Sequence, residues 1–248
     1  MAINVNAVYR TVLSILNKEQ RGYMTPDEFN KTATQVQLDI FEKYFDDLNQ
    51  QMRIPQTDTD YADRQMNIDE KIAIFKTFGD CAYQAPGGYF TLPTVDFLGN
   101  TVELYRLGSV VYNDEVEMQR LDRNDFYYVE KSGLTRASLQ FPNYLYENEF
   151  LFVRPTAITS RVTANYVRKP LDVRWGYTVG PQGQYLYDST VYEPTLNPTG
   201  STQFELHPSE QSEVVIKILM YAGIIIRDPQ IVQAAAQEAA MNEQNEKL

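Results

Sequence analysis

The stretch MTPDEFNKTATQVQLDIFEKYFDDLNQQM, residues 24–52, decides the fold, because it combines a complete helix start with a long apolar pattern. Thr25 can cap the free amides of the first turn, and Pro26 stands at the first helical position. Glu28 lies three residues after Thr25, the spacing of a capping box. The stretch therefore predicts a long helix that begins at Pro26.

The apolar residues of this helix form two stripes that together cover about 200° of its circumference. One stripe holds Phe29, Ala33, Val36, Ile40 and Tyr44, and the other holds Leu38, Phe41, Phe45, Leu48 and Met52. One packed face of a small domain needs less apolar surface than this. We therefore expect the helix to meet a second partner surface, which a neighbouring subunit could provide.

Outward from this helix, the chain has helical patterns at both ends and a strand-rich middle. A first helix is expected to end near Gly22, and a third over residues 68–78, marked by Ile68, Ile72, Phe75 and Phe78. A C-terminal helix is expected from about His207, followed by an alanine-rich helical segment over residues 230–241.

The middle of the chain consists of short segments rich in Tyr, Val, Phe and Thr, separated by Gly, Pro and Asn. Strands are expected at residues 88–92, 101–107, 115–121 and 161–168, and residues 176–200 read as a loop-rich tract that can include a hairpin. Strands at this spacing without helices between them favour an antiparallel sheet or sandwich.

These patterns predict an α+β fold in which the N- and C-terminal helices form one layer packed beside an antiparallel β-sheet or sandwich. The expected divisions are an N-terminal helical region over residues 1–78, a β-domain over 79–205, and C-terminal helices over 206–248 that pack with the N-terminal region.

Composition limits the possible functions. The 248 residues carry 33 acidic and 22 basic side chains, a net charge of -11, which disfavours capture of nucleic acid by the whole surface. The N-terminus lacks a secretion signal, and the longest apolar run, residues 214–226, is shorter than the roughly 20 residues that span a bilayer. We expect a soluble protein made in a cytoplasm, with no membrane contact.

Catalytic and metal-binding chemistry has little support in the sequence. The chain has one cysteine, Cys81, and one histidine, His207, so no common zinc site can form within it. A Cys81–His207 dyad is disfavoured, since His207 precedes Pro208 at an expected helix start and reads as a cap. A close carboxylate pair in a pocket would favour a hydrolase instead. We expect no enzyme activity, no cofactor and no metal.

Positive charge is concentrated at Arg161, Arg168, Lys169 and Arg174, interleaved with aromatic residues. The group can form a patch that meets an acidic neighbouring protein, or one that lines a passage for nucleic acid. It can equally protect an edge strand by charge, with no further role. The sequence favours protein contact without excluding the other two interpretations.

Several blocks of the sequence resemble virion structural proteins of crAss-like bacteriophages. They are LNKEQRGYMTPDEFN at residues 16–30, YVRKPLDVRW at 166–175, FELHP at 204–208, VVIKIL at 214–219 and AGI at 222–224. In outline the chain also resembles the tubular adaptor proteins that lie below the portal in short-tailed phages. The middle of the chain, residues 81–148, adds little to this resemblance.

The resemblance implies a homomeric ring of about twelve copies in the portal or head-to-tail connector of a virion, because connector rings match or divide the portal symmetry. It implies portal and neighbouring tail or ring proteins as partners, and DNA only as non-specific cargo that passes through the centre. The expected location is the virion, assembled in the cytoplasm of the bacterial host. The candidate interface residues are Phe29, Leu38, Phe41, Phe45, Leu48, Met52, Arg161, Arg168, Lys169, Arg174, Ile231, Val232 and Ala235.

A second class of function stays open. With 18 tyrosines, 12 phenylalanines and one tryptophan, the chain could instead form a glycan- or receptor-binding β-sandwich of a virion. A shallow groove lined by tyrosines and Trp175 would favour that interpretation.

Overall fold

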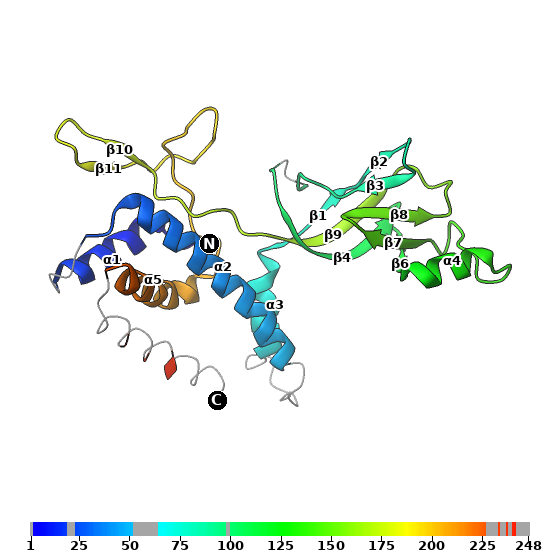
Figure 1. Ribbon diagram of the computed structural model, residues 1–248, viewed down its shortest axis with the longest axis horizontal. Coiled ribbons are helices and arrows are strands. Elements are labelled where there is room, and N and C mark those ends of the chain that lie inside the picture. The colour runs from blue at the N-terminus through cyan, green and yellow to red at the C-terminus, as the bar shows by residue number, and fades with distance from the viewer. Residues whose placement is uncertain are drawn as a thin grey trace. The chain divides into compact units, whose positions relative to one another are not determined.

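The computed structural model describes residues 2–18, 23–51, 64–97 and 100–226, together with residues 233, 237, 240 and 241. The chain forms two compact units: unit 1 comprises Met1–Ile74 and Pro170–Leu248, and unit 2 comprises Phe75–Lys169. The helical and strand elements of Figure 1 confirm the α+β class. The division differs from the expected boundary at residue 205, because residues 170–205 belong with the helices of unit 1.

Unit 1 is built on helices from both ends of the chain. They are α1 (Val5–Lys18), α2 (Pro26–Gln51), α3 (Arg64–Ala73) and α5 (Gln211–Ile226), the last preceded by the 3-10 turn η2 (Pro208–Glu210). Helix α5 packs against α1 and α2, and α3 packs against α2. The Tyr221 hydroxyl of α5 donates a 2.7 Å hydrogen bond to Asp39 of α2. For α5 the predicted packing of N- and C-terminal helices is therefore confirmed; the predicted alanine-rich segment over residues 230–241 lies outside the described residues, apart from residues 233, 237, 240 and 241.

The start of α2 is the predicted capping box. The Thr25 amide donates to Glu28 Oε2 over 2.9 Å, and the Glu28 amide donates to Thr25 Oγ1 over 3.4 Å. Hydrogen bonds from Thr25 lower the pKa of the Glu28 carboxyl, and the bond from the Thr25 main-chain amide has the largest effect. The box satisfies amide groups that the first helical turn cannot pair internally.

The apolar stripes of α2 find their partners largely within unit 1. Every residue of the first stripe is buried, and so are Phe41 and Phe45 of the second. Leu38 and Leu48 are half-buried, and Met52 lies outside the described residues. The expected need for a neighbouring subunit does not follow, because unit 1 itself buries the whole first stripe and part of the second.

The third predicted helix is too long at its C-terminal end. Helix α3 ends at Ala73, and Phe78 lies in strand β1 (Lys76–Asp80). Ile68, Ile72 and Phe75 fit a helical period, but strand pairing of residues 76–80 with residues 163–167 prevails over that local pattern.

Unit 2 is a β-sandwich of two sheets (Figure 1). The first sheet has the order β1–β9–β4–β5, with β9 at Val162–Arg168, β4 at Leu104–Tyr112 and β5 at Val116–Glu117. The second has the order β2–β3–β8–β7–β6, with bounds Ala82–Gln84, Tyr89–Thr91, Phe150–Arg154, Asn143–Glu147 and Gln119–Arg120. Residues of both sheets, among them Val110, Ala164, Phe90 and Leu151, form one buried core.

One helix interrupts the strands of unit 2. Helix α4 (Arg123–Lys131) connects β6 to β7, and these two strands pair in parallel. A parallel pair cannot be joined by a tight hairpin, so the intervening helix serves as the crossover. The expectation of strands without helices between them is wrong at this point; every other described strand pair is antiparallel.

The loop-rich tract of unit 1 contains the expected hairpin, formed by β10 (Tyr177–Val179) and β11 (Tyr185–Tyr187). Across the described part of the chain, no helix has both the length and the apolar character needed to cross a membrane.

Candidate functional site

A row of polar side chains on α2 holds an extended segment, residues 171–175, which we call the strap. Gln37 Nε2 donates to the Leu171 carbonyl over 2.7 Å. The Val173 amide donates to Thr34 Oγ1 over 3.1 Å, and the Trp175 amide donates to Asn30 Oδ1 over 2.7 Å. The helical spacing of the three side chains thus matches alternate residues of an extended chain.

The strap fixes the position of the β10–β11 hairpin through Trp175. This side chain is only 4% exposed. Its ring stacks on Tyr177 and Tyr187 of the hairpin, at centroid distances of 5.9 and 5.6 Å, and lies 4.4 Å from the ring of Tyr9 in α1. Trp175 therefore anchors the hairpin to the helices and is not part of an exposed aromatic groove.

The loop after the hairpin is organised by Asp188. Thr190 donates to Asp188 Oδ1 from both its hydroxyl, at 2.5 Å, and its amide, at 3.0 Å. The Thr199 hydroxyl donates to Oδ2 over 2.8 Å. Hydrogen bonds from Thr190 and then Thr199 lower the pKa of the Asp188 carboxyl. The loop is therefore a structured element that holds its side chains in place.

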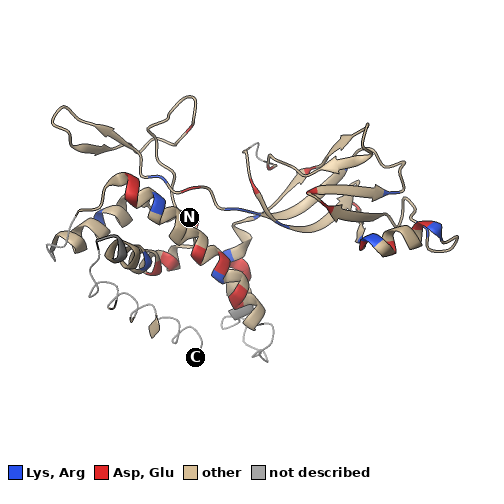
Figure 2. Ribbon diagram, viewed as in Figure 1, with Lys and Arg blue, Asp and Glu red and all other residues tan. Residues whose placement is uncertain are grey.

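Large apolar side chains project from this hairpin and loop. We call Val179, Leu186, Val191 and Leu196 the hairpin surface; Val191 is 75% exposed and Leu196 is 82% exposed. Figure 2 shows that the β10–β11 hairpin carries no charged residue, and Asp188 and Glu193 are the only charged residues between positions 177 and 200. In the register of the hairpin, Val179 pairs with Tyr185 and Leu186 with Thr178, so Val179 and Leu186 lie on opposite faces of the two strands. Large exposed apolar side chains on an ordered, nearly uncharged element are candidates for contact with another protein.

A second exposed apolar group lies in unit 2, on α4 and the loop after it. We call Tyr127, Tyr128, Leu134, Leu139 and Phe141 the arm surface; Leu134 is 99% exposed and Phe141 is 76% exposed. The sequence-based interpretation missed these residues. The available signal was three large apolar residues, Leu134, Leu139 and Phe141, in a segment otherwise made of Ser, Gly, Thr, Arg, Ala and Gln.

The arm surface is anchored to the sandwich. Phe126 of α4 is buried, and the guanidinium of Arg154 lies 5.2 Å from the centre of its ring. The Arg123 guanidinium makes two hydrogen bonds to Glu147 of β7 through Nε, at 2.9 and 3.0 Å. The arm surface therefore stands on a fixed base.

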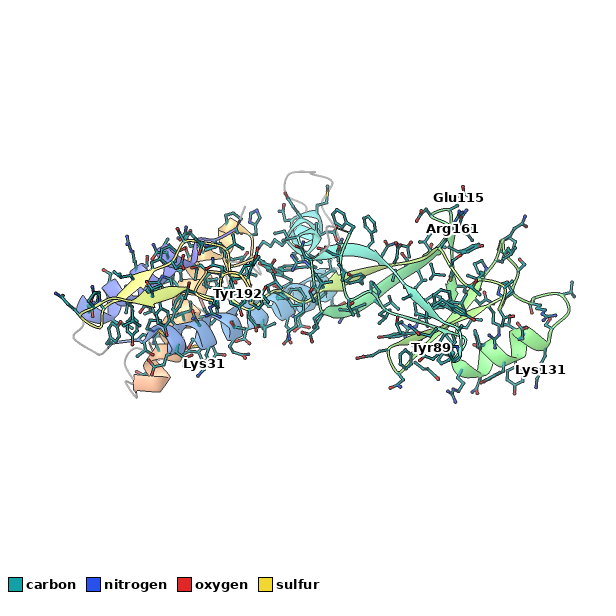
Figure 3. The ribbon with its side chains drawn as sticks, turned by 90° about the horizontal axis from the view of Figure 1, so that it is seen from above. Lys31, Tyr89, Glu115, Lys131, Arg161 and Tyr192 are labelled. Carbon is teal, nitrogen blue, oxygen red and sulfur yellow. The ribbon has the colours of Figure 1, made fainter. Side chains whose placement is uncertain are left out.

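The four predicted basic residues do not form one patch. Arg161 precedes β9 and Arg168 ends it, so the strand separates them by roughly 23 Å at about 3.3 Å per residue. Lys169 pairs with Glu103 at 3.0 Å, and the Arg168 guanidinium lies 5.7 Å from the ring centre of Phe75. Arg174 belongs to unit 1, where its guanidinium covers the ring of Tyr192, labelled in Figure 3.

The candidate interface residues of α2 occupy different environments. Phe29, Phe41 and Phe45 are buried in unit 1 and so have no surface to offer a neighbour in this conformation. Leu38 and Leu48 keep part of their surface exposed. The remaining candidates, Met52, Ile231, Val232 and Ala235, lie outside the described residues.

The two residues considered for nucleophilic chemistry have structural roles. His207 caps η2, where its Nδ1 accepts a 3.3 Å hydrogen bond from the Ser209 amide. Cys81 is buried in the core of unit 2. Within the described ranges, no group of three or more His, Cys, Asp or Glu side chains could hold a metal ion.

The sequence matches no protein-family model and no curated protein.

Proposed function

We propose that the chain is a structural subunit of a phage virion, which assembles with copies of itself into a closed ring of the head-to-tail connector. The hairpin surface of one subunit contacts the arm surface of the next. The observation that carries this proposal is the presence of two chemically similar, exposed apolar surfaces on two separate units of one chain. A ring needs two different complementary surfaces on every subunit. The rotation that relates one subunit to the next must also bring the last subunit back to the first.

The physical character of both surfaces supports this role. Val191, Leu196, Leu134 and Phe141 are each at least 75% exposed, and covering a side chain of this kind is worth about 1.5–3 kcal/mol. Both surfaces stand on ordered elements, the hairpin on Trp175 and Asp188, and the arm on Phe126. Ordered surfaces lose little conformational entropy on association.

The charge of the chain suits the proposed passage of DNA. The net charge of -11 repels phosphate groups, and Lys169 and Arg161 each have a partner within the chain. A wall that repels phosphate lets DNA slide, whereas a basic wall would hold it. The ring would contain about twelve subunits if it matches a portal of that symmetry.

Analytical ultracentrifugation and negative-stain imaging of the purified chain test the proposal. We expect closed rings of one size, and monomers at every concentration up to about 0.1 mM would contradict it. Leu196→Asp in the hairpin surface and Leu134→Asp in the arm surface should each abolish rings. Ile15→Asp and Val95→Asp, at exposed apolar positions outside both surfaces, are the matched controls.

A mixture of the two variants tests the pairing itself. Equal amounts of Leu196→Asp and Leu134→Asp chains keep one intact contact, between the hairpin surface of one variant and the arm surface of the other. We therefore expect mixed dimers and no rings. If each variant alone still forms rings, neither surface is part of the interface.

A further inference from the structure

A polar cavity of about 480 Å³ opens at one end of unit 2. Its wall includes Asp80 at the end of β1, Tyr83 of β2, the β4–β5 turn at Asn113 and Asp114, and residues 159–163, which lead into β9. Figure 3 shows Glu115 and Arg161, from the turn and this last segment, at the same end of the unit. Cavities of about 300–1,000 Å³ are of the size that holds small ligands.

The cavity wall is built by strand register and turn geometry. Thr163 pairs with Asp80 across β9 and β1, and Val162 pairs with Tyr112 at the end of β4. The Asn113 amide then donates to the Arg161 carbonyl over 2.9 Å, and Arg161 Nη1 donates to Asn113 Oδ1 over 2.8 Å. These contacts fix the guanidinium beside the turn.

Three residues of the wall have left-handed backbone conformations: Asn113, Asp114 and Arg161, with φ of 56°, 58° and 56°. Asn and Asp accept this conformation readily in a hairpin turn, but Arg rarely adopts it. The two hydrogen bonds between Arg161 and Asn113 hold Arg161 in this left-handed conformation. The polar groups of the wall are therefore at fixed positions.

The two carboxylates of the cavity share one donor. Thr163 Oγ1 lies 3.2 Å from Asp80 Oδ1 and 3.5 Å from Asp114 Oδ1, and its single proton can serve only one of them at a time. Among the described residues, neither Asp80 nor Asp114 has another hydrogen-bond donor. Asp80 and Asp114 form a close carboxylate pair of the kind that would favour a hydrolase, but both side chains are exposed rather than enclosed in a pocket. Their oxygens can accept hydrogen bonds from a ligand.

The mixture of charges selects the kind of ligand. The carboxylates of Asp80 and Asp114 disfavour an anion, and the fixed guanidinium of Arg161 disfavours a cation. Hydroxyl groups suit both, because a hydroxyl can donate to a carboxylate and accept from a guanidinium or an amide. The half-buried ring of Tyr83 adds an apolar surface against which the carbon atoms of such a ligand can pack.

We propose that this cavity binds a neutral, polyhydroxylated ligand, namely a sugar unit of a glycan. Asp80 and Asp114 accept hydrogen bonds from its hydroxyl groups, Arg161 and Asn113 donate to its oxygens, and Tyr83 packs against its ring. This site is independent of ring assembly, since it uses no residue of the hairpin or arm surface.

Saturation-transfer NMR on the full chain tests the proposal, with glucose, galactose, mannose and N-acetylglucosamine as separate probes at about 1–20 mM. We expect saturable binding of at least one sugar, weakened at least tenfold by Asp80→Ala and by Asp114→Gly. Glycine accepts the left-handed conformation at position 114, so the second variant removes the carboxylate without backbone strain. Glu149→Gly is the matched control, because Glu149 is also left-handed, with φ of 64°, but lies outside the cavity wall.

Three results would overturn the proposal. One is the absence of saturable binding for all four sugars, and another is binding that neither cavity variant changes. The third is saturable binding of Ca²⁺, lost in both variants, without any sugar binding, which would make the cavity a cation site. None of these results bears on ring formation.

Discussion

Lys76 and Val167 face each other in the register of β1 and β9, so the chain enters and leaves unit 2 at adjacent positions. The Arg168 amide donates to the Phe75 carbonyl over 2.9 Å and extends this pairing to the edge of the unit. Unit 2 is therefore an insertion between two parts of unit 1, with its own core and with ends that are already close together.

This relationship predicts that residues 75–169 fold alone. The isolated fragment should show one cooperative thermal transition and dispersed amide resonances, because its buried core comes from its own two sheets. Circular dichroism and a two-dimensional NMR spectrum measure both properties. The control is the same fragment with Leu151→Asp, which places a charge in the core and should remove the transition. A wild-type fragment without a transition would show that the core needs unit 1.

The hydrogen bonds of the strap predict that removing the Asn30 side chain destabilises the protein more than the partial exposure of this residue suggests. The Asn30 side chain accepts from the Trp175 amide at 2.7 Å and donates to the Trp175 carbonyl at 3.4 Å. Asn30→Ala should lower the free energy of unfolding by about 1–3 kcal/mol, because it leaves partly buried main-chain groups without partners. Gln35→Ala, on an exposed position of α2, should change it by less than about 0.5 kcal/mol.

Urea denaturation followed by fluorescence of the single tryptophan measures both variants. Hydrogen exchange should also show faster exchange of the β10–β11 amides in Asn30→Ala alone. Equal stability of the two variants would mean that the strap is held by packing rather than by these hydrogen bonds.

The ion pairs of Glu213 predict how the stability of the fold depends on pH. Burial raises the pKa of its carboxyl, but Lys43 at 3.3 Å and Lys217 at 3.2 Å outweigh that effect and hold the pKa below its usual range. A carboxyl with a lowered pKa in the folded state stabilises that state above its unfolded pKa, near 4.5, and this contribution is lost as the pH falls through the folded value.

Unfolding free energies between pH 7 and pH 3 test this effect. Glu213→Gln should lower stability at pH 7 and reduce the fall of stability below pH 4.5. Glu42→Gln, an exposed acid of α2, should keep the wild-type pH profile. Parallel profiles for wild type and Glu213→Gln would contradict the assigned role of the two lysines.

Local signals explain why some features could be predicted from the sequence. The Thr25–Glu28 capping box and the burial of Phe29 follow from spacing within a few residues, so one sequence was sufficient for them. The same holds for β9, where alternation at Val162, Ala164 and Tyr166 matches the observed burial. Each of these features depends on one element and its own periodicity.

Other features depend on contacts between distant segments. Asn30, Thr34 and Gln37 read as an ordinary polar face, and their strap partners lie more than 130 positions away. The cavity has the same origin, since Asp80 and Asp114 approach each other only through the register of three strands. Arg168, Lys169 and Arg174 are close in sequence, but each side chain contacts a different residue, so they do not act as one basic group.

Cys81 gives the last prediction, which concerns reactivity. Burial, followed by repulsion from Asp80, raises the pKa of its thiol to about 12. At pH 8 almost no thiolate is then present, and the thiolate is the form that attacks thiol reagents. We expect the native chain to react with a disulfide reagent such as DTNB at least 100-fold more slowly than the urea-unfolded chain. A Cys81→Ser, Ser160→Cys chain is the control, because it moves the one cysteine to an exposed position and should react rapidly when native. Because Cys81 lies among the residues around the cavity, rapid reaction of the native thiol would mean either that unit 2 opens at this end or that the cavity gives direct access to it, and the assigned burial would be wrong.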